Sequence, residues 1–161
     1  MKIIDERLLQ QLGEQARQLP RKRKNLNFHW GDGDLLQRML NAFEPGTYVR
    51  PHRHKDPDKR EVFIVLKGRV AMMFFDDTGI LSRTVVLSAK DGTYGVEVEP
   101  GEWHAVASLE KGSVVYEIKD GPYSPATDKD FAPWAPVEGL PECDGYLHKL
   151  LVAANLRVDE K

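Results

Sequence analysis

Residues 46–68 read GTYVRPHRHKDPDKREVFIVLKG, and this stretch decides the fold that we expect for the rest of the chain. His52 and His54 are separated by one residue, so an extended strand places both side chains on the same face. Alternation along the run that begins at Glu61 puts its carboxylate on the same side as Phe63. A carboxylate that shares a face with apolar side chains is costly to bury unless it is paired or bound to a cation. The segment therefore predicts two strands that carry imidazoles and a carboxylate.

The same strand character continues after this segment. Runs rich in valine, isoleucine, phenylalanine and leucine alternate with turn signals such as Lys67-Gly68 and Lys111-Gly112. These runs predict strands at 35–43, 61–67, 69–75, 80–88, 94–98, 103–108 and 113–119. Many short strands without intervening helices indicate an antiparallel sandwich or barrel, so we expect an all-β fold.

Segments of a different kind flank the strands. Apolar residues recur at helical spacing across 3–19, which predicts an amphipathic helix that stops at Pro20. Five prolines between 121 and 145 disfavour regular strands and predict an ordered cover, and residues 145–156 suit a short closing helix. We therefore divide one domain into an N-terminal helix with a basic segment (1–33), a barrel (34–120) and a C-terminal extension (121–161).

Composition narrows the class of protein. The chain has 161 residues, the size of a single domain with one hydrophobic core. Its 23 basic side chains nearly balance 25 acidic ones, which gives no reason to expect nucleic acid as a partner. The single Cys143 rules out an intramolecular disulfide, and no apolar run approaches the length of a membrane span or the pattern of a signal peptide. We therefore expect a cytoplasmic protein without a membrane partner.

A third histidine extends the ligating set of the first strands. His104 follows the turn Pro100-Gly101 at the start of another predicted strand. With His52, His54 and Glu61 it gives three imidazoles and one carboxylate, a set that suits Zn, Fe, Mn or Ni better than Ca or Mg. These four residues therefore predict a site for one divalent transition-metal ion, and a six-coordinate ion there keeps two positions for water, a substrate or dioxygen.

Two motifs in the chain resemble those of the cupin superfamily. The first is Gly46-TYVRP-His52-Arg-His54 followed by Glu61-VFIVLK-Gly68, with a gap of six residues before Glu61 that is longer than usual. The second is Gly95-VEVE-Pro100-Gly101-EW-His104, after which Ser108 stands in place of the usual asparagine. The resemblance implies a double-stranded β-helix, the jelly-roll barrel, with the metal on the same four residues.

Over its whole length the chain resembles a narrower group, the WbuC-type cupin fold metalloproteins. This resemblance rests on Arg21-Lys-Arg-Lys-Asn25 with Asn27 and His29, on Pro51-His-Arg-His54, and on Phe131-Ala-Pro-Trp-Ala-Pro136. It implies a metal-bound cupin barrel and a link to the biosynthesis of surface polysaccharides, and it supplies no reaction.

Other side chains are candidates to contact a molecule bound at the metal. Two of them share strand parity with His52 and one shares it with His104, while two more follow the basic segment 21–24 and are expected to fold over the barrel mouth. An arginine among them offers a fork for carboxylate or phosphate. We therefore expect a small anionic or hydroxylated ligand. Its predicted contacts are Arg50, Tyr48, Asn27, His29 and Ser108.

Three functions compete at this point. The first is a metal-dependent enzyme that isomerises or epimerises a small polar metabolite such as a sugar or sugar derivative, with Tyr48, His29 and Glu117 as candidates for the proton-transferring group. The second is an oxygenase with non-haem iron. The third is a non-catalytic protein that uses the metal to hold a small ligand. Cupin barrels commonly associate through sheet edges, so we expect a homodimer.

Overall fold

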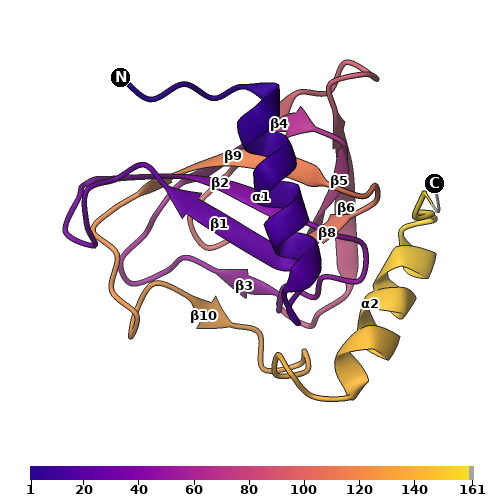
Figure 1. Cartoon of the computed structure of the whole chain (residues 1–161). Helices are drawn as coiled ribbons and strands as arrows, with labels where there is room; N and C mark the ends of the chain where they lie inside the picture. Colours follow the sequence, from indigo (N-terminus) through magenta and orange to yellow (C-terminus); the bar gives the residue numbers. More distant parts are fainter. Residues whose placement is uncertain (160–161) are drawn as a thin grey trace.

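Ten strands form two antiparallel sheets that face each other (Figure 1). The computed structural model describes residues 1–159. The strands are β1 (Arg23–Asn27), β2 (Leu36–Phe43), β3 (His52–Arg53), β4 (Glu61–Lys67), β5 (Arg69–Phe75), β6 (Leu81–Ser88), β7 (Gly95–Val98), β8 (Trp103–Ser108), β9 (Ser113–Asp120) and β10 (Asp130–Phe131). The first sheet has the order β1-β2-β9-β4-β7 and the second the order β10-β3-β8-β5-β6. The predicted all-β jelly-roll barrel is confirmed.

Strand alternation sends one set of apolar side chains into the space between the sheets. On β5, Val70, Met72 and Phe74 point inward, and Val65 of β4 and Val115 of β9 meet them from the other sheet. Met73 and Phe75 of β5 point outward and belong to a different core cluster. The barrel interior is therefore a packed apolar core at this end, and the opposite end is free for polar groups.

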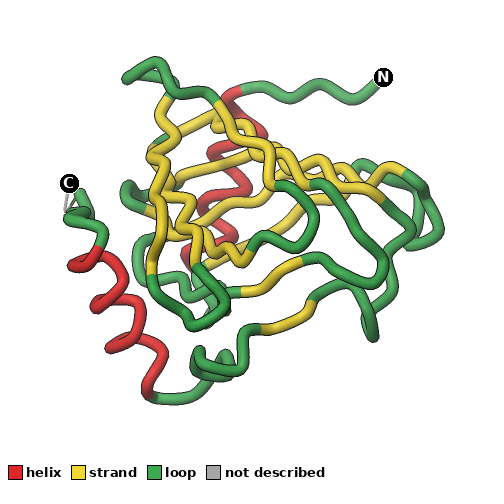
Figure 2. The backbone as a smooth tube through the Cα atoms, turned by 180° about the vertical axis from the view of Figure 1, so that it is seen from behind, coloured by secondary structure: helices red, strands yellow, loops and turns green. Residues whose placement is uncertain are grey.

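A helix covers the outer face of each sheet, as the views from both sides show (Figures 1 and 2). Helix α1 (Glu6–Gln18) begins where the Asp5 side chain accepts a hydrogen bond from the Leu8 backbone N–H at 2.9 Å. Its apolar stripe packs on the first sheet. Helix α2 (Glu142–Ala153) starts directly after Pro141 and packs on the second sheet. Among residues 1–159, neither helix has the length and apolar character needed to cross a bilayer.

The second half of the basic segment 21–24 belongs to a strand that the sequence pattern did not predict. Residues 23–27 form β1 and pair with β2 from Arg23↔Phe43 to Asn27↔Met39. Only Leu26 of this strand packs in the apolar cluster under α1. The inward-facing positions are polar because they line a cavity, so the usual apolar alternation is missing.

Replacing Gly68 by alanine tests the tight connection between β4 and β5. Gly68 has φ of +71°, and a Cβ atom there would lie 2.9 Å from the Cα of Ser113, a buried residue whose hydroxyl is fixed by Arg69 and Glu110. Gly92 has a similar φ of +84° but open space around it. We expect Gly68→Ala to cost about 1–3 kcal/mol more stability than Gly92→Ala, because only the first adds a clash to the backbone strain. Urea unfolding measures the difference, and equal losses would contradict the tight packing.

Candidate metal centre

Four predicted ligands meet at one end of the space between the sheets. His52 on β3 and His104 on β8 are register partners, Glu61 is the first residue of β4, and His54 follows β3. All four side chains are buried, and their ligand atoms lie within 4.8 Å of one another. The structure thus brings together from both sheets the whole set that strand parity predicted.

Backbone carbonyl groups orient the three imidazole rings. The Nδ1 atom of His52 lies 3.0 Å from the Arg50 carbonyl oxygen, and that of His104 lies 2.9 Å from the Glu102 carbonyl oxygen. His54 Nδ1 makes the same contact with the carbonyl oxygen of Asp128. A carbonyl only accepts, so each ring donates its Nδ1–H and leaves Nε2 with a lone pair. Metal-bound histidines are usually held in this way.

The donor atoms fit a transition-metal ion. Glu61 Oε2 lies 3.0 Å from His104 Nε2 and 3.2 Å from His54 Nε2, so a carboxylate oxygen faces two ring lone pairs. Only a proton or a metal ion relieves this opposition of acceptors. Adjacent ligand atoms of an octahedral ion at about 2.1 Å are roughly 3.0 Å apart, close to both distances. Three nitrogens and one oxygen also match the preference of Zn, Fe, Mn or Ni.

The electrostatics of the ligands agree with this assignment. Burial raises the pKa of Glu61, but a proton on the facing Nε2 atom of His104 or His54, which is the alternative to a metal ion there, outweighs burial and holds that pKa well below the usual range. Burial, with the nearby positive charge of Lys129, holds the pKa of His52 well below its usual value. The carboxylate and neutral imidazole forms that result are the forms that bind metals.

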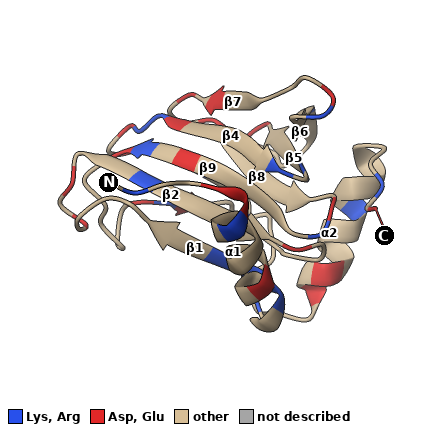
Figure 3. Cartoon of the chain, turned by 45° about the horizontal axis from the view of Figure 1, so that its top comes forward, with Lys and Arg blue, Asp and Glu red and all other residues tan. Residues whose placement is uncertain are grey.

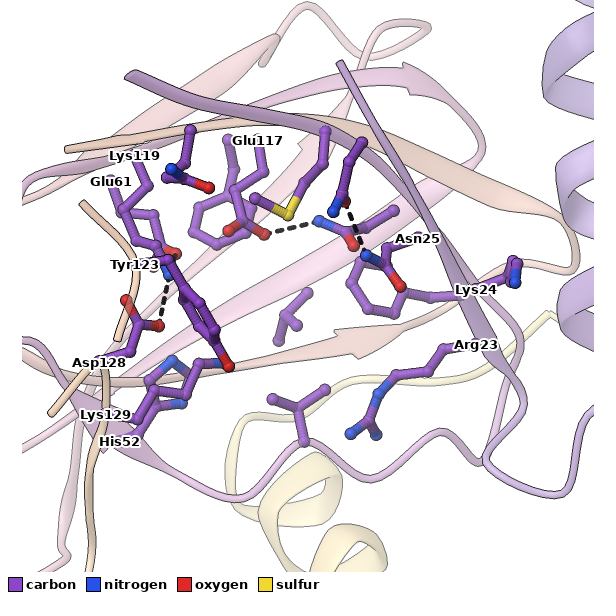
Figure 4. A pocket seen from close by; sticks show the side chains of 18 of the residues that line it. Arg23, Lys24, Asn25, His52, Glu61, Glu117, Lys119, Tyr123, Asp128 and Lys129 are labelled. Carbon is purple, nitrogen blue, oxygen red and sulfur yellow. Dashed lines mark hydrogen bonds and ion pairs between the residues drawn. The ribbon is translucent and has the colours of Figure 1, made fainter. Parts of the chain in front are cut away.

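A cavity of about 440 Å³ opens from these ligands, two of which, His52 and Glu61, are part of its wall (Figure 4). Strands β1, β2, β4 and β9 supply most of the remaining wall, and the cover, β8 and the loops next to β1 and β2 supply the rest. Polar or charged lining residues include Arg21, Arg23, Lys24, Asn25, Asn27, His29, Asp32, Gln37, Asn41, Glu117, Lys119, Tyr123, Asp128 and Lys129. Acidic and basic positions lie close together on β9 (Figure 3). The cavity is therefore suited to a small polar molecule.

One carboxyl group in the cavity is not a member of the ligand set. Glu117 on β9 is the register partner of Phe63, and its Oε2 accepts a hydrogen bond from Asn41 Nδ2 at 2.6 Å. Burial, followed by the negative charge of Glu61, raises the pKa of Glu117 to about 8. Glu117 was one of three predicted proton-transferring groups, and it lines the cavity as that role requires.

A buried aspartate ties the cover to the metal centre. The Asp128 carboxylate accepts from Lys59 Nζ at 3.0 Å and from Lys119 Nζ at 2.7 Å. Lys59 also donates to the Pro122 carbonyl oxygen at 2.6 Å. Because the Asp128 carbonyl oxygen accepts from His54, the same residue anchors the cover and orients a ligand. Lys119 lies two residues after Glu117 on the same strand, so alternation could have predicted that its side chain points inward. The proline-rich cover carries no comparable sequence signal for the position of Asp128.

The other predicted ligand-binding residues divide into two groups. Asn27 and His29 line the cavity, as expected for residues at the barrel mouth, and the Nδ1 of His29 accepts from the Arg38 backbone N–H at 3.1 Å. Tyr48, Arg50 and Ser108 do not line it. Their placement corrects the prediction from strand parity.

Parity failed for Tyr48 and Arg50 because it does not extend to their positions, and it failed for Ser108 because that residue lies at the other end of β8 from His104. Residues 47–51 form no strand, so the alternation from His52 does not reach them. Tyr48 lies in the core under α2 and donates its hydroxyl to Pro136 O at 2.9 Å, and Arg50 Nη2 donates to Ala132 O at 2.8 Å. Ser108 lies at the far end of β8, where its hydroxyl is used by backbone carbonyls.

Fold and site together define a cupin barrel with a buried site of metal-binding type, and comparisons with known proteins agree on the fold. Residues 4–87 match the family model "Domain of unknown function (DUF6016)", so the chain belongs to the DUF6016 family. No curated protein sequence matches it.

Three solved structures share the fold at low sequence identity. The capsular polysaccharide assembling protein CapF from Staphylococcus aureus matches at 22% identity and a TM-score of 0.56, over 66% of this chain and 28% of CapF. L-ribose isomerase from Cellulomonas parahominis matches at 16% identity and 0.54, over 70% of each chain. An oxalate oxidase matches at 16% identity and 0.52, over 86% of this chain and 70% of its own. This chain thus corresponds to less than a third of CapF, and these likenesses concern the fold alone.

Metal analysis of two glutamate variants tests the site. We expect the wild-type protein to bind about one equivalent of a divalent transition metal, and Glu61→Gln to bind it at least about tenfold more weakly because the only anionic ligand is lost. Glu117→Gln is the matched control, since it removes a carboxyl group from the same cavity outside the ligand set. Competition with a chelator measures the affinities. Equal affinity in the wild type and Glu61→Gln would exclude this site.

A pair of aspartate variants tests how the cover is anchored. Asp128→Asn removes the carboxylate that pairs with the buried Lys59 and Lys119, so we expect a loss of roughly 3 kcal/mol in the free energy of unfolding. Asp130→Asn removes the partner of Arg53 from a more exposed pair, and we expect it to lose about 0–1 kcal/mol. Chemical denaturation compares them. Similar losses would show that the lysine pair does not depend on Asp128.

Proposed function

We propose that the protein is a metal-dependent enzyme that isomerises or epimerises a small polar metabolite such as a sugar or sugar derivative. The observation that carries this proposal is the position of Glu117. It places a non-ligating carboxyl group in the same cavity as the metal ligands His52 and Glu61, and a hydrogen bond from Asn41 fixes its orientation. Proton transfer at a carbon next to a carbonyl group needs at least a metal site and an oriented acid–base group close to it.

The residues of the cavity have distinct roles in this proposal. The four ligands His52, His54, Glu61 and His104 would hold a divalent ion, which would polarise the carbonyl oxygen of the substrate. Glu117, as a carboxylate, removes a proton from the carbon next to the carbonyl carbon. In an isomerisation it returns this proton to the former carbonyl carbon while the hydroxyl proton passes to the former carbonyl oxygen, and in an epimerisation the proton returns to the other face of the same carbon. Asn25, Asn27 and Gln37 offer amide groups to substrate hydroxyls from β1 and β2. The apolar side chains of Phe63 and Val106 complete the wall.

Two further considerations support a sugar as the substrate. Among proteins with the same fold, one is named as an L-ribose isomerase and another as a capsular polysaccharide assembling protein. The resemblance of the sequence to the WbuC-type cupins points to surface polysaccharide biosynthesis as well. We therefore propose that the substrate is a sugar derivative of that biosynthesis, handled in the cytoplasm by a homodimer.

Proton exchange provides the test. We expect metal-loaded protein, kept without dioxygen in D₂O with a panel of pentoses, hexoses, uronates and sugar phosphates, to incorporate deuterium beside the carbonyl of at least one sugar, as read by NMR. Glu117→Gln should lower the rate roughly 10²–10⁴-fold while the metal content stays the same. Glu97→Gln, on the exposed face of β7, is the control and should match the wild type.

Other outcomes of the same experiment favour the two competing functions. Turnover that requires iron and dioxygen would replace the isomerase with an oxygenase. Saturable sugar binding without exchange under any condition would indicate a non-catalytic binding protein. Exchange that is unchanged in Glu117→Gln would show that another group moves the proton.

A further inference from the structure

Lys129 is an inward-pointing basic side chain that the proposed reaction does not use. It lies in the cover between Asp128 and β10, and its side chain reaches into the cavity near His52 (Figure 4). No hydrogen bond or ion pair links its ammonium group to another residue within 1–159. The nearby buried lysines differ in this respect, because Lys59 and Lys119 are both held by the carboxylate of Asp128.

Among residues 1–159, no carboxylate lies within ion-pair distance of this ammonium group. Lys129 is partly buried, and burial lowers its pKa although the more distant charges of Glu61, Glu117 and Asp128 act in the opposite direction. The carboxylate of Glu61 is shared by His54, His104 and Lys119, and that of Glu117 is bound to Asn41. Both carboxylates therefore have closer partners, and the ammonium group of Lys129 is left available for an anion that enters the cavity.

The charge balance of the cavity with a divalent ion bound also favours an anionic ligand. Five lysines and arginines and four aspartates and glutamates are found among its described lining residues. Glu138 offsets this excess of one positive charge through its ion pairs with Arg21 and Arg23 at the rim, so the protein groups alone are balanced. A divalent ion on the ligand set makes the cavity clearly positive. Such a cavity attracts an anion, and binding there strengthens each charge interaction because water is largely excluded.

We propose that the cavity selects an anionic metabolite, with a carboxylate or phosphate group bound by the ammonium group of Lys129 while the reacting end of the molecule lies at the metal site. This inference rests on the proposed function and narrows its substrate to acidic sugars, either sugar acids or sugar phosphates. Lys129 is the specificity-determining residue for the charged group, and it forms a charge-assisted hydrogen bond that a neutral sugar cannot make.

Binding of two simple anions tests the inference without any turnover. Full-length protein loaded with Co²⁺ is titrated with malonate and, separately, with inorganic phosphate, and calorimetry and the visible Co²⁺ spectrum are recorded. We expect Lys129→Met to weaken binding of at least one anion by about tenfold or more, and Lys129→Arg to keep most of the affinity because it keeps the charge. Lys90→Met, on the exposed turn after β6, should bind like the wild type. Metal content and melting temperature are measured for every variant.

The outcomes separate this inference from the function on which it rests. A larger loss for malonate identifies a carboxylate as the recognised group, and a larger loss for phosphate identifies a phosphate. Full metal loading with equal anion affinity in wild type and Lys129→Met would overturn the role of Lys129 and leave the metal centre standing. The role of Lys129 would also be overturned if neither malonate nor phosphate bound to the metal-loaded wild type. Absence of metal binding in the wild type would instead remove the proposed function itself.

Discussion

The contact between the Glu61 carboxylate and the Nε2 atoms of His54 and His104 is the constraint on which the rest of the structure depends. Three buried groups that accept hydrogen bonds converge there. They remain compatible only if a positive charge lies among them. The backbone carbonyls of Arg50, Glu102 and Asp128 enforce the arrangement because each accepts a hydrogen bond from the Nδ1–H group of one ring. Since Asp128 belongs to the cover, the cover is part of the metal centre.

The barrel accommodates such a polar site because its interior is polar at one end of the strands and apolar at the other. On β4 the inward positions run from Glu61 through Phe63 to Val65, and on β9 they run from Lys119 to Val115. Each strand therefore crosses from the cavity into the apolar core between the sheets. The core and the two helices supply the hydrophobic burial that offsets the cost of desolvating the charged groups at the other end.

The parts of the fold that could be predicted are those whose pattern lies within a single segment of the sequence. Seven strands follow from apolar runs between turn signals, and alternation places His52, His54 and Glu61 on common faces. Strand β1 was not predicted, since its inward side chains, including Asn25 and Asn27, face a polar cavity and erase the apolar pattern. Tyr48 and Arg50 were misplaced because parity was extended past Pro51 into a segment without strand geometry. Contacts made by the cover depend on tertiary packing, which a proline-rich sequence does not encode locally.

A line of alternating charges connects the cover with the metal centre. It runs from Lys59 to Asp128, on to Lys119, and reaches Glu61, whose Oε1 lies 3.9 Å from the Lys119 ammonium group. A cation bound at the ligand set draws on the charge of Glu61, so Lys119 then relies more fully on Asp128. The same aspartate holds His54 through its backbone. The ligand set and the contacts that hold the cover thus share Asp128 and Glu61, so metal binding there would be linked thermodynamically to the packing of the cover.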